Sequence, residues 1–120
     1  MSYEIGSSYG YSPFYNQYLL SSVTFGNSVT HIGDSIFRGC SDILNIIIPD
    51  NITTIKSYAF KECTGLASIT IGNGVTSIEE SAFWNCSDLK TVYNYSSLNL
   101  VKGSSDYGYV AHYADEVINM

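Results

Sequence analysis

Charge is scarce in this chain of 120 residues, and positive charge is the scarcest. Charged residues make up 13%, with five Lys and Arg against eleven Asp and Glu, whereas an average soluble domain has roughly a quarter. The net charge of −6 argues against a nucleic-acid partner, because phosphate binding needs clustered basic side chains. No apolar run approaches the ~18–20 residues of a membrane helix, so membrane insertion is not expected.

Sequence marks of export and of chemistry are also missing. The first residues, Met1 to Glu4, contain neither a basic segment nor an apolar one, so no signal peptide is visible. The chain has no C-x-x-C pair, no Gly-rich phosphate loop and no dinucleotide fingerprint. We therefore expect no cofactor and no metal, and the length predicts one domain.

What the chain does contain is an internal repeat of 23 residues, the step from Phe37 to Phe60 and from Phe60 to Phe83. Three full units cover about 20–42, 43–65 and 66–88, and a partial fourth begins at Leu89. A period of this length is the mark of a repeat architecture. The apolar columns that keep the step are Phe37/Phe60/Phe83, Cys40/Cys63/Cys86, Ile32/Ile55/Ile78, Val29/Ile52/Val75, Phe25/Ile48/Ile71, Val23/Ile46/Ile69/Val92 and Leu20/Ile43/Leu66/Leu89.

Each unit has the pattern of one coil of a solenoid. In the third copy, residues 68–71 alternate polar and apolar as a half-buried strand does, and residues 72–74 form a turn. Residues 75–78 are a second short extended piece, and residues 82–86 predict one helical turn. Because no unit can bury its apolar face alone, the coils must stack. The expected fold is a repeat solenoid of the α+β leucine-rich-repeat type, with short parallel strands and one helical turn per coil.

The unit from Leu66 to Cys86 resembles the BspA-like (Treponema-type) leucine-rich repeat, with the pattern Leu-x-x-Ile-x-Ile-x-x-x-Val-x-x-Ile-x-x-x-Ala-Phe-x-x-Cys. The first copy departs from it at Ile36, where the family has alanine, so we expect this coil to be slightly overpacked. The resemblance implies a curved parallel solenoid within a bacterial surface or secreted protein. It also implies a role in adhesion or protein recognition.

Ten of the eleven tyrosines lie outside the repeats, and the two ends resemble each other at 6–11 and 103–109. Both ends predict amphipathic helices that cover the ends of the core, although a Tyr-rich binding platform is an alternative. The expected organisation is a Tyr-rich N-terminal cap helix in 1–19, the solenoid in 20–95, and a linker with a C-terminal cap helix in 96–120. The apolar positions of the two helices are Tyr11, Phe14, Tyr15, Tyr18 and Leu19, and Val110, Tyr113, Ala114, Val117 and Ile118.

This similarity of the ends suggests that the chain is one unit of a longer array, in which cap helices alternate with repeat blocks. A location outside the cell or at its surface, as part of that longer protein, would then be compatible with the missing signal peptide. The exposed strand edges of a short solenoid also predict weak self-association through its ends.

The cysteine column and a Ser–His–Asp set were considered as chemical sites. The cysteines occupy an apolar column, which favours buried free thiols, although a bridge from Cys63 to Cys40 or Cys86 remains open in an oxidising compartment. Ser28, His31 and Asp34 occupy variable exposed columns of the repeat, which argues against a catalytic triad. We therefore do not expect an enzyme.

The best candidate surface is the outer face of the main sheet, which should bind protein or serve as a spacer. Its side chains are small, polar and nearly uncharged, and Ile47 beside Thr70 and Tyr93 could form an apolar centre. The alternative is a carbohydrate-binding module that uses this polar face with Tyr93 and Tyr95. The residues of the face are Ser22, Thr24, Asn45, Ile47, Ser68, Thr70, Thr91 and Tyr93.

Overall fold

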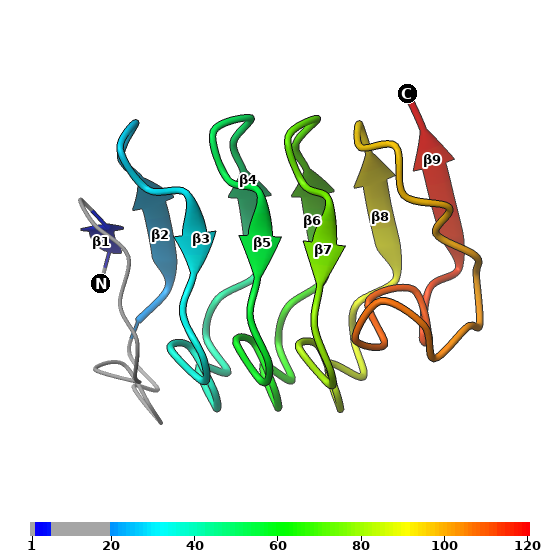
Figure 1. The fold of residues 1–120 in the computed structure, drawn as a ribbon. Helices are drawn as coiled ribbons and strands as arrows, with labels where there is room; N and C mark the ends of the chain where they lie inside the picture. Colours follow the sequence, from blue (N-terminus) through cyan, green and yellow to red (C-terminus); the bar gives the residue numbers. More distant parts are fainter. Residues whose placement is uncertain (1, 6–19) are drawn as a thin grey trace.

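The computed structural model describes residues 2–5 and 20–120, which form a solenoid of short parallel strands (Figure 1). This confirms the predicted repeat solenoid. The expected N-terminal helix positions, Tyr11 to Leu19, lie outside the described residues. The strands are β1 (Ser2–Ile5), β2 (Ser22–Phe25), β3 (His31–Ile32), β4 (Asn45–Ile48), β5 (Thr54–Ile55), β6 (Ser68–Ile71), β7 (Ser77–Ile78), β8 (Thr91–Asn94) and β9 (Glu116–Asn119).

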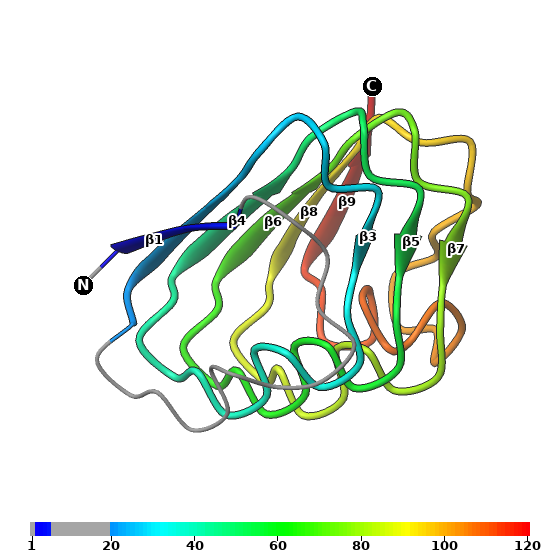
Figure 2. The same ribbon diagram turned by 60° about the vertical axis from the view of Figure 1, so that its left-hand side comes forward.

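Each coil contributes a four-residue strand to one side of the solenoid, and the regular coils add a two-residue strand on the other (Figure 2). We call β1, β2, β4, β6, β8 and β9 the front strands, although β4 and β6 lie behind β5 and β7 in the view of Figure 1. They form a pair, β1-β2, and a four-stranded sheet, β4-β6-β8-β9. The back sheet is β3-β5-β7. Every pairing is parallel, and Asn45 is opposite Ser68, which is opposite Thr91, so the 23-residue step sets the register.

The front strands form because their sequences alternate with the period of a β-strand. In β4, Ile46 and Ile48 are buried whereas Asn45 and Ile47 are exposed. Branched side chains such as isoleucine favour a pleated, half-buried strand. Stacking therefore places equivalent isoleucines of successive coils in the same layer of the core, as Ile46 and Ile69 show.

The segment that was expected to be one helical turn is a series of tight turns. In the first coil the N–H of Ile36 donates to the carbonyl of Gly33, and the N–H of Cys40 donates to that of Phe37. Ser35, which lies between Gly33 and Ile36, has a φ of 57°, and the equivalent Tyr58 of the next coil has a φ of 60°. A left-handed residue interrupts a right-handed helix. The chain therefore makes its bend with three-residue steps, and no helix forms among the described residues.

Three stacked phenylalanines form the centre of the core. The ring centroids of Phe37 and Phe60 are 5.3 Å apart with planes inclined by 17°, and those of Phe60 and Phe83 are 5.1 Å apart and inclined by 10°. All three side chains are fully buried. The offset between successive coils thus fits one aromatic ring per coil.

The C-terminal end of the core is closed by turns and a strand, so the expected C-terminal cap helix is wrong. Residues 106–113 form turns, and Glu116–Asn119 form β9, which pairs with β8. The N–H of Phe83 donates to the carbonyl of Gly108 at 2.8 Å, and Val110 and Ala114 are buried. The spacing of three and four therefore marked two buried residues, Val110 and Ala114, while Tyr113, Val117 and Ile118 are only partly buried and the backbone is not helical.

The three cysteines of the column are buried, and none of them forms a disulfide. The thiol of Cys63 donates to the carbonyl of Phe37, and that of Cys86 to the carbonyl of Phe60, each at 3.0 Å. Neither bridge that was left open is present. Burial, and then the hydrogen bond with the Cys86 thiol, raise the pKa of Cys63 well above its ordinary value.

This raised pKa predicts alkaline destabilisation. The stabilising effect of keeping Cys63 neutral is complete below the ordinary thiol pKa of about 8.5, and is lost as pH rises through the higher pKa of the folded state. In that window the loss is about 1.4 kcal/mol per pH unit. Urea denaturation in reductant at about pH 7 and about pH 10 should therefore show a smaller loss of stability in Cys63→Ala than in the parent chain. Equal losses in both proteins would contradict the effect.

Candidate recognition surface

The eight predicted surface residues lie on one side of the front strands, and all are accessible to solvent. The register aligns Asn45, Ser68 and Thr91 in one row and Ile47, Thr70 and Tyr93 in the other. Ser22 and Thr24 are the outward residues of β2, which lies beside β4 (Figure 1). We call this surface the sheet face. The structure thus brings together all the residues that the repeat columns predicted for it.

Strand β9 extends the sheet face beyond the prediction. Glu116 is opposite Thr91, and Ile118 is opposite Tyr93. The sequence carried a signal for this, because Glu-Val-Ile-Asn at 116–119 repeats the pattern Thr-Val-Tyr-Asn at 91–94. The interval is 25 residues rather than 23, since the fourth coil has a longer connection. The fixed period of 23 residues therefore does not lead from β8 to β9.

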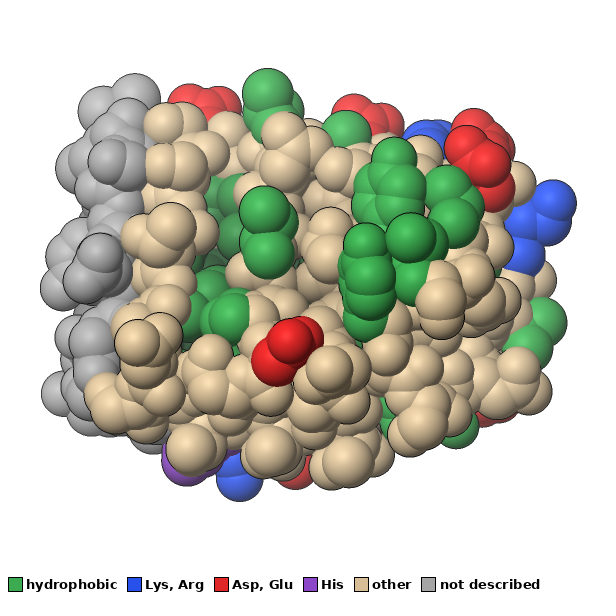
Figure 3. Space-filling model, turned by 90° about the horizontal axis from the view of Figure 1, so that it is seen from above, with side chains coloured by type: hydrophobic (Ala, Val, Ile, Leu, Met, Phe, Trp, Pro, Cys, Tyr) green, Lys and Arg blue, Asp and Glu red, His purple; other side chains and the backbone are tan. Residues whose placement is uncertain are grey.

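Large apolar side chains interrupt the polar rows. Ile47 is 68% exposed, Tyr95 49% and Tyr93 38%. Figure 3 shows hydrophobic atoms in a hollow near the β2 side of the molecule and a second group on the β8 side. Exposed apolar side chains of this size, grouped on a polar surface, are typical of interaction sites.

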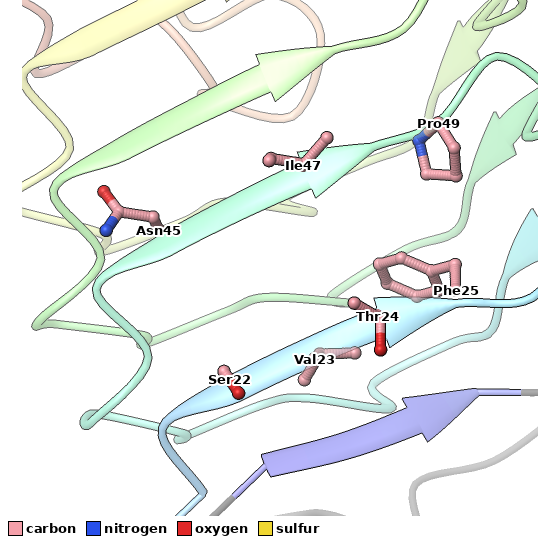
Figure 4. A pocket seen from close by; sticks show the side chains of 7 residues that line it. All are labelled: Ser22, Val23, Thr24, Phe25, Asn45, Ile47 and Pro49. Carbon is pink, nitrogen blue, oxygen red and sulfur yellow. The ribbon is translucent and has the colours of Figure 1, made fainter.

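Two adjoining hollows are present beside Ile47. The first, which we call the β2–β4 hollow, has a volume of about 350 Å³, and Figure 4 shows its side chains along both strands. The second, the Ile47–Tyr95 hollow, has about 390 Å³. The two share Ile47 and Pro49. The first is lined by Ser22, Val23, Thr24, Phe25, Asn45, Ile47 and Pro49, and the second by Ile47, Ile48, Pro49, Asp50, Thr70, Gly72 and Tyr95.

The first hollow exists because β2 and β4 lie side by side without forming a strand pairing. After β8 and β9 the next N–H donates to the preceding strand of the sheet, from Tyr95 to the carbonyl of Ile71 at 2.9 Å and from Met120 to that of Asn94 at 3.0 Å. Pro49 occupies this position after β4, and proline has no N–H. The two strands therefore lack this hydrogen bond.

Large side chains in the first coil also favour the gap between β2 and β4. Phe25 occupies the column of Ile48 and Ile71, and its ring packs edge-on against Phe37 with centroids 6.1 Å apart. Ile36 is buried where the other coils have alanine. Larger side chains in a close-packed layer push the neighbouring strands apart. The back sheet and the turns of the first two coils remain bonded, for example from Phe37 N–H to Ala59 at 2.8 Å.

The charge in the lining of the two hollows is negative only. No Lys or Arg lines either of them, and Asp50 is the one charged residue among their lining side chains in the described part of the chain. The N–H of Asn73 donates to Oδ1 of Asp50 at 2.9 Å, which fixes the position of this carboxylate. The hydroxyl of Ser68 donates to Oδ1 of Asn45. The sheet face therefore combines apolar side chains with uncharged polar ones, and the carboxylate of Asp50 adds a fixed negative charge at its edge.

Two of the remaining sequence candidates, His31 and Asp34, have contacts with neighbours in the chain. The hydroxyl of Ser35 donates to Asp34 at 2.7 Å, and Nδ1 of His31 is 3.3 Å from the hydroxyl of Thr30. Each of these two contacts joins residues that are adjacent in the sequence. Within residues 2–5 and 20–120, no three His, Cys, Asp or Glu side chains are grouped as metal ligands. The same residues contain no helix of the length and apolarity required to cross a bilayer.

Comparison with known families explains this architecture. The sequence profile of the BspA type leucine rich repeat region matches residues 7–107 in six copies. The chain belongs to the BspA-type leucine-rich repeat family. The matched residues include β2, β4, β6 and β8, whereas β1 and β9 lie outside them. The six copies exceed the three full units and one partial unit that the 23-residue columns indicated. No curated protein matches the chain.

Two solved structures resemble this BspA-type chain. A leucine rich cell surface protein from Faecalibacterium prausnitzii A2-165 has 32% sequence identity and a TM-score of 0.62, over 80% of this chain and 24% of that one. A leucine-rich repeat protein from Bacteroides ovatus ATCC 8483 has 24% identity and a TM-score of 0.71, over 96% of this chain and 30% of that one. The second shows the shared fold. The chain therefore spans only 24% and 30% of the length of these two proteins.

Proposed function

We propose that this chain is a non-enzymatic recognition module of a surface-exposed or secreted bacterial protein, and that it binds a protein partner through the sheet face. One observation carries the proposal: the outer face of a parallel sheet presents exposed apolar side chains beside two hollows. Ile47, Tyr93 and Tyr95 lie on three different turns or strands of one surface. Solenoids commonly bind partners through such rows of stacked side chains.

Several features support a role in binding rather than catalysis. The hollows contain neither a nucleophile beside a base nor a group of metal ligands among the described residues. Their lining is apolar with a few polar groups, which is the composition of a recognition site. A surface location is supported by the relative from Faecalibacterium prausnitzii, which is a cell surface protein.

A peptide selection tests the proposal. Random peptides displayed on phage are selected on the chain, and the best binder is synthesised and its Kd measured by fluorescence anisotropy. We expect Ile47→Asp to weaken binding by about tenfold or more, because the charge would stand at the centre of an apolar contact. The side chain is 68% exposed, so this variant should keep the parent melting temperature.

The matched control is Thr64→Asp, which adds the same charge at an exposed position outside the sheet face. It should bind as the parent does. Selected peptides that bind Ile47→Asp with the Kd of the parent would contradict the proposal. A glycan array offers the opposing result: sugar binding that is abolished by Tyr93→Ala would favour a carbohydrate-binding module.

A further inference from the structure

We propose that the sheet face binds an extended segment of the partner protein that carries an apolar side chain and, two residues away, a lysine or arginine. The apolar side chain enters the β2–β4 hollow, and the basic one enters the Ile47–Tyr95 hollow. This inference rests on the proposed function and specifies the chemistry of the partner.

The β2–β4 hollow is suited to a single large apolar anchor. Its volume of about 350 Å³ is at the lower end of the range for ligand pockets, about 300–1,000 Å³. Val23, Phe25 and Pro49 provide an apolar lining from both strands (Figure 4). The polar side chains Ser22 and Asn45 lie at its other end, on the outward row. A buried anchor in such a hollow is the usual source of affinity in a small interface.

The two hollows are spaced for neighbouring side chains on one face of an extended chain. They share Ile47 and Pro49, so their centres are separated by about one to two strand spacings, roughly 5–10 Å. In an extended chain, side chains two residues apart point to the same side and are about 6.6 Å apart. The segment would therefore cross the strands above Ile47, with every second side chain directed into the face.

Charge complementarity specifies the second side chain. Asp50 lines the Ile47–Tyr95 hollow, and its carboxylate is held by the N–H of Asn73 at 2.9 Å. Tyr95 lines the same hollow and is 49% exposed. A lysine or arginine there would pair with the carboxylate and could lie over the tyrosine ring. The net charge of −6 also favours a positively charged partner.

The selected peptides provide the first measurement. Their consensus should place Leu, Ile, Phe or Trp two residues from Lys or Arg, and the synthetic peptide should bind more weakly as salt is raised, because salt screens the exposed ion pair. Ser22→Trp, which fills the β2–β4 hollow from its rim, should weaken binding by about tenfold. Asp50→Asn should weaken it by about three- to tenfold and reduce the salt dependence.

Two matched variants separate these effects from misfolding. Asparagine keeps the acceptor that the N–H of Asn73 uses, so Asp50→Asn removes the charge while it preserves the turn. Thr91→Trp adds the same bulk as Ser22→Trp on the same side of the sheet but lines neither hollow, and it should bind the peptide as the parent does. Each variant is compared at an equal folded fraction, measured by circular dichroism.

The outcomes distinguish this inference from the proposed function. Peptides whose binding is abolished by Ile47→Asp but unaffected by Ser22→Trp and Asp50→Asn would overturn the two-hollow arrangement. The proposal that the sheet face binds a protein partner would then still hold. A consensus without the paired apolar and basic residues would overturn it in the same way. Peptides that bind all three variants with the affinity of the parent would overturn both proposals.

Discussion

Replacing Phe60 with alanine is expected to lower the free energy of unfolding by about 3–5 kcal/mol, the cost of removing a large aromatic side chain from a packed core. Its ring lies between those of Phe37 and Phe83, with centroid distances of 5.3 and 5.1 Å. All three rings are fully buried, so solvent cannot fill the space that the alanine leaves. The loss is a large fraction of the 5–15 kcal/mol that stabilises a typical domain. Urea denaturation followed by circular dichroism measures it.

Two controls define the cause of this loss. Phe60→Leu keeps much of the volume and should lower stability by about 1–2 kcal/mol. Thr64→Ala alters an exposed turn residue next to Cys63 and should stay within about 0.5 kcal/mol of the parent. A Phe60→Ala protein as stable as the Thr64→Ala protein would show that the stacked rings are not the centre of the core.

Replacing Asn94 with isoleucine is expected to lower the free energy of unfolding by about 2–4 kcal/mol, because the hydrogen bonds of its buried amide to two backbone and two side-chain groups would be lost. This is a strict test, since Ile48 and Ile71 occupy the same column in the preceding coils. Asn94 is 2% exposed. Its Nδ2 donates to the carbonyl of Leu98 and to Oδ1 of Asn119, each at 2.9 Å.

The other side of the Asn94 amide holds the turn that follows β8. Its Oδ1 accepts the N–H of Ser96 at 3.0 Å and the hydroxyl of the same residue at 2.6 Å. Isoleucine would fill the space but satisfy none of these groups. A thermal or urea melt of Asn94→Ile therefore separates packing from hydrogen bonding at one position.

A double-mutant cycle with Asn119→Ala isolates the bond between β8 and β9. Asn119 is exposed, so its single substitution should cost only about 0.5–1.5 kcal/mol. After Asn94→Ile, the further loss should be smaller, because the bond that it removes is already absent. An Asn94→Ile protein as stable as the parent would mean that the amide contributes nothing to closing the fourth coil.

Most of the core and of the sheet face could be predicted from the repeat columns. A column such as Phe37/Phe60/Phe83 reports on burial directly, because equivalent residues of stacked coils share one environment. The alternation within Asn45–Ile48 also gave the orientation of each side chain. The prediction failed in the C-terminal segment, where Val117 and Ile118 belong to a strand. A short apolar pair fits a helical and an extended period equally well, and only pairing with β8 decides between them.

The sequence by itself determined that the chain forms stacked coils, which side chains enter the core and which eight residues share the outer face. Periodicity determines these features because each coil repeats the same local pattern. Only the tertiary structure decided that β2 and β4 separate. Pro49 has no N–H to offer to β2, and Phe25 adds bulk between the stacked coils. Those are contacts between residues far apart in the chain, and the hollows beside Ile47 result from them.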